Sequence, residues 1–443
     1  MDGRSGARNT VTAGSGLPVV ATAGRIVLGL LVANIAIDFV LRAAGLVVSM
    51  NTVVPLTDVF GDYFRFVTSY PGGDRVTTAV PWLLDQLHGY GDTRPTSGLA
   101  GLAIGAPTHF NAPPLNTLFG LVTVRAMRWI DPALLFAATY LGLLLYWAAI
   151  ARRFAPSIAD RRALVLLGVL SYPMLLMLVR GNVYAGLTGL LIVHAMLIAS
   201  TRGSGQAAAI LLAVALGMRP NALVFAVPLI ALCRDRRQTL LALAVATPVI
   251  SGAALVLAHL AYPAYTPATF AAGVRNYYLI YVTQGHGVPF GSSLYGALAI
   301  LFPHEGLTGV APVPAGVVGL AAMLLYGLRR IGVVPFVFLI GAAYCLGSTI
   351  IADYHLFVFM APVMLAAGTA QARGLKPAGR IALIASCLML APKNYLFEGD
   401  VSIQPLLNPL LLLAASAAIV ATGMRSAAPL PIPSRPPGRC HAA

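Results

Sequence analysis

Two carboxylates stand close together in the stretch TDVFGDYFRF, residues 57–66, of a chain in which only 10% of residues are charged. On a helix, Asp58 and Asp62 would lie one turn apart on the same face. A carboxylate held beside aromatic side chains near a membrane surface can accept a proton from a hydroxyl nucleophile. The alternative is the solvated face of a surface helix, and the residues alone leave both interpretations open.

Basic side chains interrupt apolar sequence at several points. Arg180 and Asn182 stand in LVRGNVY, and Arg219 stands in GMRPNAL. Each arginine alone fits a turn with a snorkelling side chain. Together, at neighbouring turns, they could clamp a phosphate, because the guanidinium group is planar and always charged. Further candidates for contact with an anionic ligand, each with a plain interface role as the alternative, are Tyr354 and His355 in ADYHLF, Lys393 in APKNYLF, and His286.

The sequence contains none of the common nucleotide or zinc-protease motifs. HExxH, the P-loop and GxGxxG are absent, which argues against ATP-driven transport and against a soluble nucleotide-sugar site. The four cysteines fit neither a disulfide framework nor a zinc site. We expect no cofactor and assign no metal ligands. A divalent metal stays open, because several acidic residues are predicted to face outward without clear ligand spacing.

The composition indicates the environment in which these residues work. The chain has 443 residues, of which 58% are hydrophobic, and its mean hydropathy is +0.82. A soluble domain is nearer half apolar and a quarter charged, so this chain is expected to lie in a bilayer. The net charge of +15 comes from short basic groups between apolar runs, which is typical of cytoplasmic loops and argues against a nucleic-acid partner.

We therefore predict an all-α integral membrane protein with about twelve transmembrane helices. Two of the predicted spans are shorter than the roughly 17–25 residues that a full crossing needs, so they extend into their flanks or form a broken hairpin. The predicted spans are 25–48, 131–151, 163–179, 183–199, 206–217, 221–233, 238–261, 312–328, 332–351, 355–371, 380–392 and 404–423.

The basic groups also predict the orientation of the chain. They place both termini in the cytoplasm, as tails of residues 1–24 and 424–443 around a transmembrane unit of residues 25–423. The large loops at about 49–130 and 262–311 then face outward, and most acidic residues lie on that side. Segments 112–129 and 291–303 are predicted to be helices lying along the outer face. The expected location is the plasma (inner) membrane, multi-pass, with a site facing the periplasm or exterior.

Several stretches together resemble a known class of enzymes. An aspartate followed by aromatics (DYFRF), FNAPPLNTLFG, RGNVYAGLTGLLIVHAML, LGMRPNALVFAVPLIALCRDRR, GSSLYGALAILF and YHLFVFMAPVMLA are similar, in that order, to segments of the polytopic glycosyltransferases of the GT-C class. The nearest resemblance is to glycosyltransferase family 87, which includes polyprenyl-phosphate-mannose-dependent α-1,2-mannosyltransferases. It covers roughly residues 25–400. The departures are Asn111 and Ala112 before the Pro-Pro pair, where the family has tyrosine, and Arg219 where lysine is common.

The resemblance implies a fold, a reaction and roles for residues. It implies a GT-C-type bundle with outer surface helices and an inverting transfer of a sugar, mannose above all, from a polyprenyl-phosphate donor to a glycolipid or glycan acceptor. It implies Asp62 as catalytic base with Asp58 in reserve. Arg180, Arg219 and His355 would hold the departing phosphate, and Asn182, Tyr354, Lys393 and His286 are further candidates for binding substrate.

Two other functions stay open at this point. In a transporter or flippase for a lipid-linked or anionic solute, the same arginines would line a pathway. Such a protein should show inverted repeats and polar residues near the membrane midplane, and no repeats are visible here. A non-catalytic scaffold for envelope assembly is also possible, although a scaffold does not need a group of charged residues on its outer face.

Overall fold

The computed structural model describes residues 17–46, 62–63, 112–202, 205–283, 291–303, 305–394 and 403–425. Within these ranges the chain is helical, and the only β contact is an isolated bridge between Gly291 and Ala352. Most of the first outer loop therefore lies outside the described residues, and so do two of the predicted site residues, Asp58 and His286. Asp62 is described, together with Tyr63.

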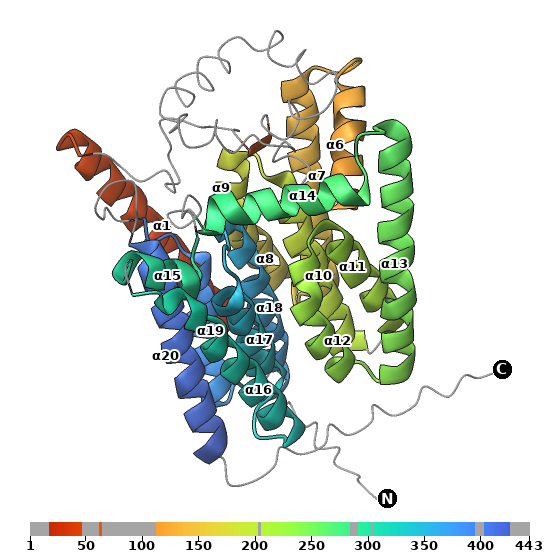
Figure 1. Cartoon of the computed structure of the whole chain (residues 1–443). Coiled ribbons are helices and arrows are strands. Elements are labelled where there is room, and N and C mark those ends of the chain that lie inside the picture. The colour runs from red at the N-terminus through yellow and green to blue at the C-terminus, as the bar shows by residue number, and fades with distance from the viewer. Residues whose placement is uncertain are drawn as a thin grey trace, which may run out of the picture.

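The helices follow the apolar runs of the sequence, and the longer ones stand roughly side by side as a bundle (Figure 1). Their bounds are α1 (Leu17–Ala43), α6 (Pro114–Ala126), α7 (Pro132–Phe154), α8 (Ile158–Leu170), α9 (Tyr172–Arg180), α10 (Val183–Arg202), α11 (Gly205–Met218), η2 (Pro220–Phe225), α12 (Ala226–Leu232), α13 (Arg236–Ala261), α14 (Pro267–Tyr277), η3 (Tyr278–Thr283), α15 (Leu294–Leu301), η5 (Leu307–Val310), α16 (Pro312–Gly327), α17 (Val333–Gly347), η6 (Asp353–Phe359), α18 (Met360–Arg373), α19 (Pro377–Leu390) and α20 (Gln404–Arg425).

The structure is that of an all-α membrane protein. Among the described residues, 7 helical segments are long and apolar enough to cross a bilayer, or 8 if the bent pair α8–α9 forms one span. Four shorter apolar helices account for the other predicted spans, namely α11, η2 with α12, α17 and α19. Every predicted span thus contains helix, and the number of full crossings stays a prediction.

The predicted span 163–179 is broken in the middle. Helix α8 ends at Leu170, and α9 begins at Tyr172 with an axis bent by 45°. Pro173 lies in the first turn of α9, where the backbone N–H has no partner within the helix and its absence costs nothing. In the interior of a continued α8, the same missing N–H would break the helix. The Ser171 hydroxyl donates to the Gly168 carbonyl at 2.7 Å and closes the end of α8. The break directs α9 toward the turn that carries Arg180.

Helix α6 differs from the helix predicted to lie along the outer face over 112–129. It packs against α13 and α11 and stands upright beside them, whereas α14 lies across the bundle (Figure 1). Its first turn is tied down, because Asn116 Nδ2 donates to the Met218 carbonyl at 3.0 Å and the Tyr265 hydroxyl donates to the Ala112 carbonyl at 2.7 Å. These bonds to the end of α11 and to the start of the 262–311 segment set its direction.

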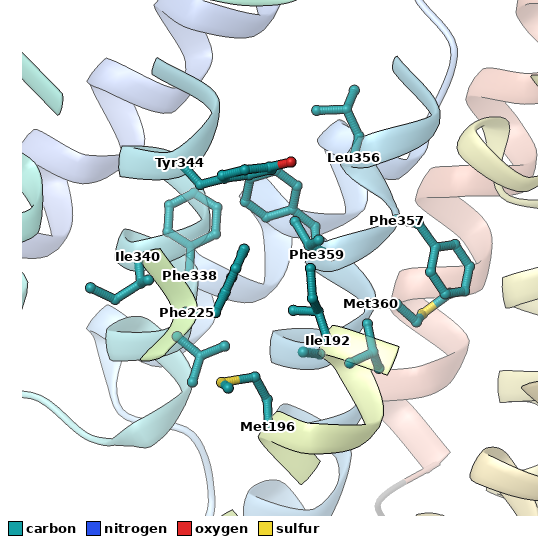
Figure 2. Packing of buried hydrophobic residues seen from close by; sticks show 14 of the residues in the cluster. Ile192, Met196, Phe225, Phe338, Ile340, Tyr344, Leu356, Phe357, Phe359 and Met360 are labelled. Atoms are coloured by element: carbon teal, nitrogen blue, oxygen red, sulfur yellow. The ribbon is translucent and has the colours of Figure 1, made fainter. Parts of the chain in front are cut away.

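The core lies where α10, η2, α17 and the η6–α18 segment meet. Figure 2 shows Phe225, Phe338, Tyr344 and Phe359 packed together there. The candidate spans of α10 and η6–α18 are the two most deeply buried, at 78% each. Residues at the ends of these two segments, such as Asn182 and Tyr354, are consequently held by the best-packed part of the molecule.

Candidate functional site

A tight turn between α9 and α10 carries two of the predicted site residues. Arg180 is the last residue of α9, and Asn182 precedes the first residue of α10. Gly181 between them has φ 74° and ψ 18°, a left-handed conformation that glycine adopts without the strain a side chain brings. The Asn182 Oδ1 accepts from the Ala185 N–H at 3.2 Å and so caps α10.

Asp62 lies against this turn and forms what we call the Asp62 cluster, consisting of Asp62, Arg180, Asn182 and Tyr354. An ion pair joins Arg180 Nη2 to Asp62 Oδ1 at 3.2 Å. Asn182 Nδ2 donates to Asp62 Oδ2 at 3.3 Å and to the Tyr354 hydroxyl at 2.9 Å. All four residues were predicted from the sequence, and they come from three segments that are far apart in it.

The cluster orients the Asp62 carboxylate without using all of its capacity. The cap bond fixes the Asn182 amide, because its oxygen is turned to Ala185 and its NH₂ group must then face Asp62. A carboxylate offers about four acceptor positions, and the contacts with Arg180 and Asn182 occupy one on each oxygen. The Asp62 side chain is 23% exposed, so a ligand can still reach it.

Tyr354 and His355 stand in the first turn of η6. Their rings meet edge to face with centroids 4.8 Å apart. His355 is buried, and its backbone N–H donates to the Ala352 carbonyl at 2.9 Å. The structure thus places His355 behind Tyr354, within electrostatic reach of Arg219. No hydrogen bond joins its ring to the Asp62 cluster among the described residues.

Arg219 differs from Arg180 in having no partner for its side chain within the described ranges. It lies in an extended connection between α11 and η2, with φ −150° and ψ 103°. Among the described residues its guanidinium makes no hydrogen bond or ion pair, and its Nε is buried. Its charge acts on Tyr354 of the Asp62 cluster and on Tyr277. Arg219 is therefore a cation beside the cluster that is available to an anionic ligand.

Tyr277 is a site residue that the sequence prediction missed. It ends α14, which lies across the bundle (Figure 1). Burial raises the pKa of the Tyr277 hydroxyl, the positive charge of Arg219 opposes that shift, and the charge of Asp62 adds to it. Both charged groups therefore act electrostatically on this hydroxyl. The only signal for Tyr277 in the sequence is the four-residue spacing from Tyr281 in the stretch RNYYLIYV.

An apolar groove opens next to Arg219. It has a volume of about 640 Å³ and lies between η2–α12, α16 and α17. Small residues at Gly316, Gly319 and Ala343 leave the space. Asn221, two residues after Arg219, and Tyr344, on which the charge of Arg219 acts, are among the residues that line it. The volume is in the range of small-molecule sites.

A buried polar network supports the start of η6. Asp353 is 1% exposed and accepts from the Ser292 hydroxyl and the Gln404 amide. The Tyr172 hydroxyl lies 3.3 Å from both Asp353 Oδ2 and Asn394 Oδ1. The network joins α9, the start of α15, η6 and α20 immediately beside Tyr354. Asp353 stands in ADYHLF, the stretch that contains Tyr354 and His355, and the other residues of the network gave no sequence signal.

Lys393 belongs to this network and not to the Asp62 cluster. Its ammonium group donates to the main-chain carbonyls of Leu388 and Ala391 at the end of α19, where a cation is favourable. Its backbone N–H donates to Gln404 Oε1 at 2.6 Å. Burial lowers the pKa of the Lys393 ammonium to about 7, and the charge of Asp353 opposes that shift. The predicted contact of Lys393 with substrate therefore has no support in its position.

The predicted site residues thus fall into three groups. Asp62, Arg180, Asn182 and Tyr354 are in contact, and Arg219 and His355 lie beside them. Lys393 lies apart, and Asp58 and His286 are outside the described residues. Within the described part of the chain, no three His, Cys, Asp or Glu side chains gather as they would around a metal ion.

Comparison with known proteins identifies no relative of this chain. No family model, no curated protein and no solved structure matches the chain.

Proposed function

We propose that this protein is an inverting glycosyltransferase that moves a sugar, mannose in the first instance, from a polyprenyl-phosphate donor to a hydroxyl of a lipid-linked or glycan acceptor. The observation that carries the proposal is the position of the Asp62 carboxylate within electrostatic reach of the same tyrosine as Arg219, whose side chain has no hydrogen-bond or ion-pair partner among the described residues, next to an apolar groove. A base, a cation and an apolar groove for part of the lipid chain are the three parts that such a reaction needs.

Asp62 acts as the general base. It takes the proton from the acceptor hydroxyl, and that oxygen attacks the anomeric carbon of the donor sugar. Arg180 and Asn182 hold the carboxylate from one side, which leaves acceptor positions on both oxygens for the incoming hydroxyl. The orientation matters because a misplacement of about 1 Å can cost a hundredfold in rate.

Arg219 stabilises the leaving group. As the bond from the anomeric carbon to the phosphate oxygen breaks, its electron pair stays on the phosphate, and the product has inverted configuration. The unpartnered guanidinium of Arg219 offsets this growing negative charge. Arg180 is paired with Asp62, so it serves the base more directly than it serves the phosphate.

The groove holds the lipid chain of the donor. Its lining is mostly apolar and includes Asn221, two residues after Arg219, and Tyr344, on which the charge of Arg219 acts. A polyprenyl phosphate laid in it would place the phosphate at the arginine and the sugar toward Asp62. In this proposal the bundle has the twelve crossings of a GT-C-type fold, both termini are cytoplasmic, and the site faces the periplasm or exterior of the plasma membrane.

The test is sugar transfer from radiolabelled polyprenyl-phosphate-mannose in membranes that contain the protein, with products extracted into organic solvent. We expect transfer by the wild type and a loss of about 10²–10⁴-fold in Asp62→Asn, the usual contribution of a general base. Arg219→Gln should reduce transfer by about 10–100-fold, the value of a charge-assisted hydrogen bond. Arg275→Gln, at an exposed position of α14, is the matched control and should transfer at the wild-type rate.

Other outcomes of this experiment would reassign the role of the base or reject the enzyme class. Full transfer by Asp62→Asn at equal expression would move the role of base to another residue, with Asp58 first. Absence of transfer by the wild type with mannose, glucose, arabinose and galactose donors would reject the glycosyltransferase and favour a transporter or flippase for a lipid-linked or anionic solute.

A further inference from the structure

Tyr63 follows Asp62 directly, and its side chain is buried although that of Asp62 is partly open. Both residues are helical, and Tyr63 is 1% exposed. Its ring meets the ring of Phe136 in α7 edge to face, with centroids 5.0 Å apart and planes inclined by 62°. This arrangement is favoured between aromatic rings, because the positive edge of one ring faces the negative face of the other. The side chain of Tyr63 thus attaches the helical turn of Asp62 to α7.

The surface that receives Tyr63 belongs to the packed core of the bundle. Phe136 is buried and stacks on Tyr140, one turn further along α7, with centroids 6.4 Å apart and planes inclined by 15°. The Tyr140 hydroxyl donates to the Met174 carbonyl of α9 at 3.4 Å. Helix α9 carries the arginine of the Asp62 cluster at its last residue. The rings of α7 and this arginine are therefore parts of one packed unit.

Two contacts hold the helical turn of Asp62 from different directions. Successive side chains on an α-helix point about 100° apart, so Asp62 and Tyr63 meet different neighbours. The Asp62 carboxylate meets the turn between α9 and α10, whereas the Tyr63 ring meets Phe136 of α7. Either contact alone leaves the helical turn able to rotate about it. The two contacts together fix the direction of the carboxylate.

We propose that Tyr63 is the positioning residue of the base. Its ring, packed against Phe136, sets the rotation of the helical turn. Arg180 and Asn182 take one acceptor position on each oxygen of the Asp62 carboxylate, and the ring decides that the remaining positions face the acceptor hydroxyl. This inference rests on the proposed function for the role of Asp62, but the attachment of the turn can be measured without sugar transfer. Tyr63 acts through Asp62 and touches neither substrate.

A cysteine placed at residue 62 reports on the attachment. The variant Asp62→Cys is combined with Cys440→Ser, and the rate of its reaction with a water-soluble maleimide is measured in detergent. The cysteines that remain in this protein are buried, namely Cys233, Cys345 and Cys387. The labelling rate therefore follows how often the turn at residue 62 opens.

Loss of the ring contact should loosen this turn. We expect Phe136→Ala, added to the labelled protein, to raise the labelling rate about tenfold, which is the value of an aromatic pair. Phe270→Ala is the matched control, because it removes the ring of another aromatic pair, Tyr265–Phe270, which has no member in the Asp62 cluster. It should leave the rate unchanged. A rate that Phe136→Ala also leaves unchanged would overturn the inference, whatever reaction the protein catalyses.

Sugar transfer tests the consequence for the reaction. Tyr63→Leu keeps an apolar side chain but lacks the ring, and it should lower kcat by about 10–100-fold while KM for polyprenyl-phosphate-mannose stays unchanged. Tyr63→Phe keeps the ring and should transfer at nearly the wild-type rate. A lower unfolding temperature of Tyr63→Leu with wild-type kcat would make the residue merely structural. Absence of transfer by the wild type, with faster labelling in Phe136→Ala, would reject Asp62 as a base and the positioning role with it, although the ring contact holds the turn.

Discussion

At the scale of single residues, the Asn182 side chain makes three hydrogen bonds that join a helix cap to the Asp62 cluster. Its amide oxygen caps α10, and its amide nitrogen reaches both Asp62 and Tyr354. The cap contributes to the stability of the protein. The two donated bonds contribute to the placement of the Asp62 carboxylate. A substitution that separates these contributions tests whether the arrangement serves function.

The variant Asn182→Ser separates the helix cap from the two donated bonds. Its hydroxyl can still cap the helix, but its short side chain cannot donate to Asp62 and Tyr354. We expect Asn182→Ser to unfold in detergent at nearly the wild-type temperature and to transfer sugar at least about tenfold more slowly, because the carboxylate is less well oriented. Asn182→Ala, which also lacks the cap, should in addition lose about 0.5–2 kcal/mol of stability. Wild-type transfer by Asn182→Ser would show that the amide contacts do not matter for the reaction.

At the scale of elements, the ends of helices determine where the site residues lie. The bend at Ser171 directs α9, the left-handed Gly181 joins α9 to α10, and the extended residue Arg219 separates α11 from η2. Each of these breaks falls at a glycine or next to a proline, and each places a polar side chain at the end of an apolar helix.

The turn at Gly181 gives a prediction about stability. An alanine at φ 74° brings its Cβ against the backbone, which costs about 1–2 kcal/mol. Gly181→Ala should therefore unfold at a lower temperature in detergent, and Gly181→Asn should lose less, since asparagine tolerates this conformation. Gly142→Ala is the control, because the added Cβ lies in the interior of α7 with nothing within 4 Å. Equal unfolding temperatures for the 181 and 142 alanine variants would contradict this account.

At the scale of the whole molecule, the network around Asp353 joins four segments that are distant in the sequence. Ser292, Gln404 and Tyr172 all direct donors toward one buried carboxylate. Buried polar groups of this kind stabilise a structure only when all of them are paired. The network therefore joins the starts of α9, η6 and α20 next to Tyr354 of the Asp62 cluster.

Asp353→Asn tests that role. The amide has one acceptor oxygen in place of two, so at least one of the surrounding donors is left without an acceptor, at a cost of about 1–3 kcal/mol. We expect a lower unfolding temperature in detergent. Asp235→Asn is the matched control, since Asp235 is exposed and caps α13 through a bond to the Gln238 N–H that asparagine makes equally well. An unchanged unfolding temperature for Asp353→Asn would mean that the network is not a stabilising contact.

The sequence by itself determined that this is a helical membrane protein and where its helices lie, because the length and apolar character of a span are local properties of the chain. It also singled out Asp62, Arg180, Asn182 and Tyr354, since polar residues at the ends of apolar helices are conspicuous. Both arginines stand in similar turns, so only the tertiary structure decided between them. Arg180 pairs with Asp62, over a hundred residues away, whereas the Arg219 side chain has no hydrogen-bond or ion-pair partner within the part of the chain that the structure describes. The same holds for Tyr277 and for the network around Asp353, whose members are ordinary residues until the packing of helices brings them together.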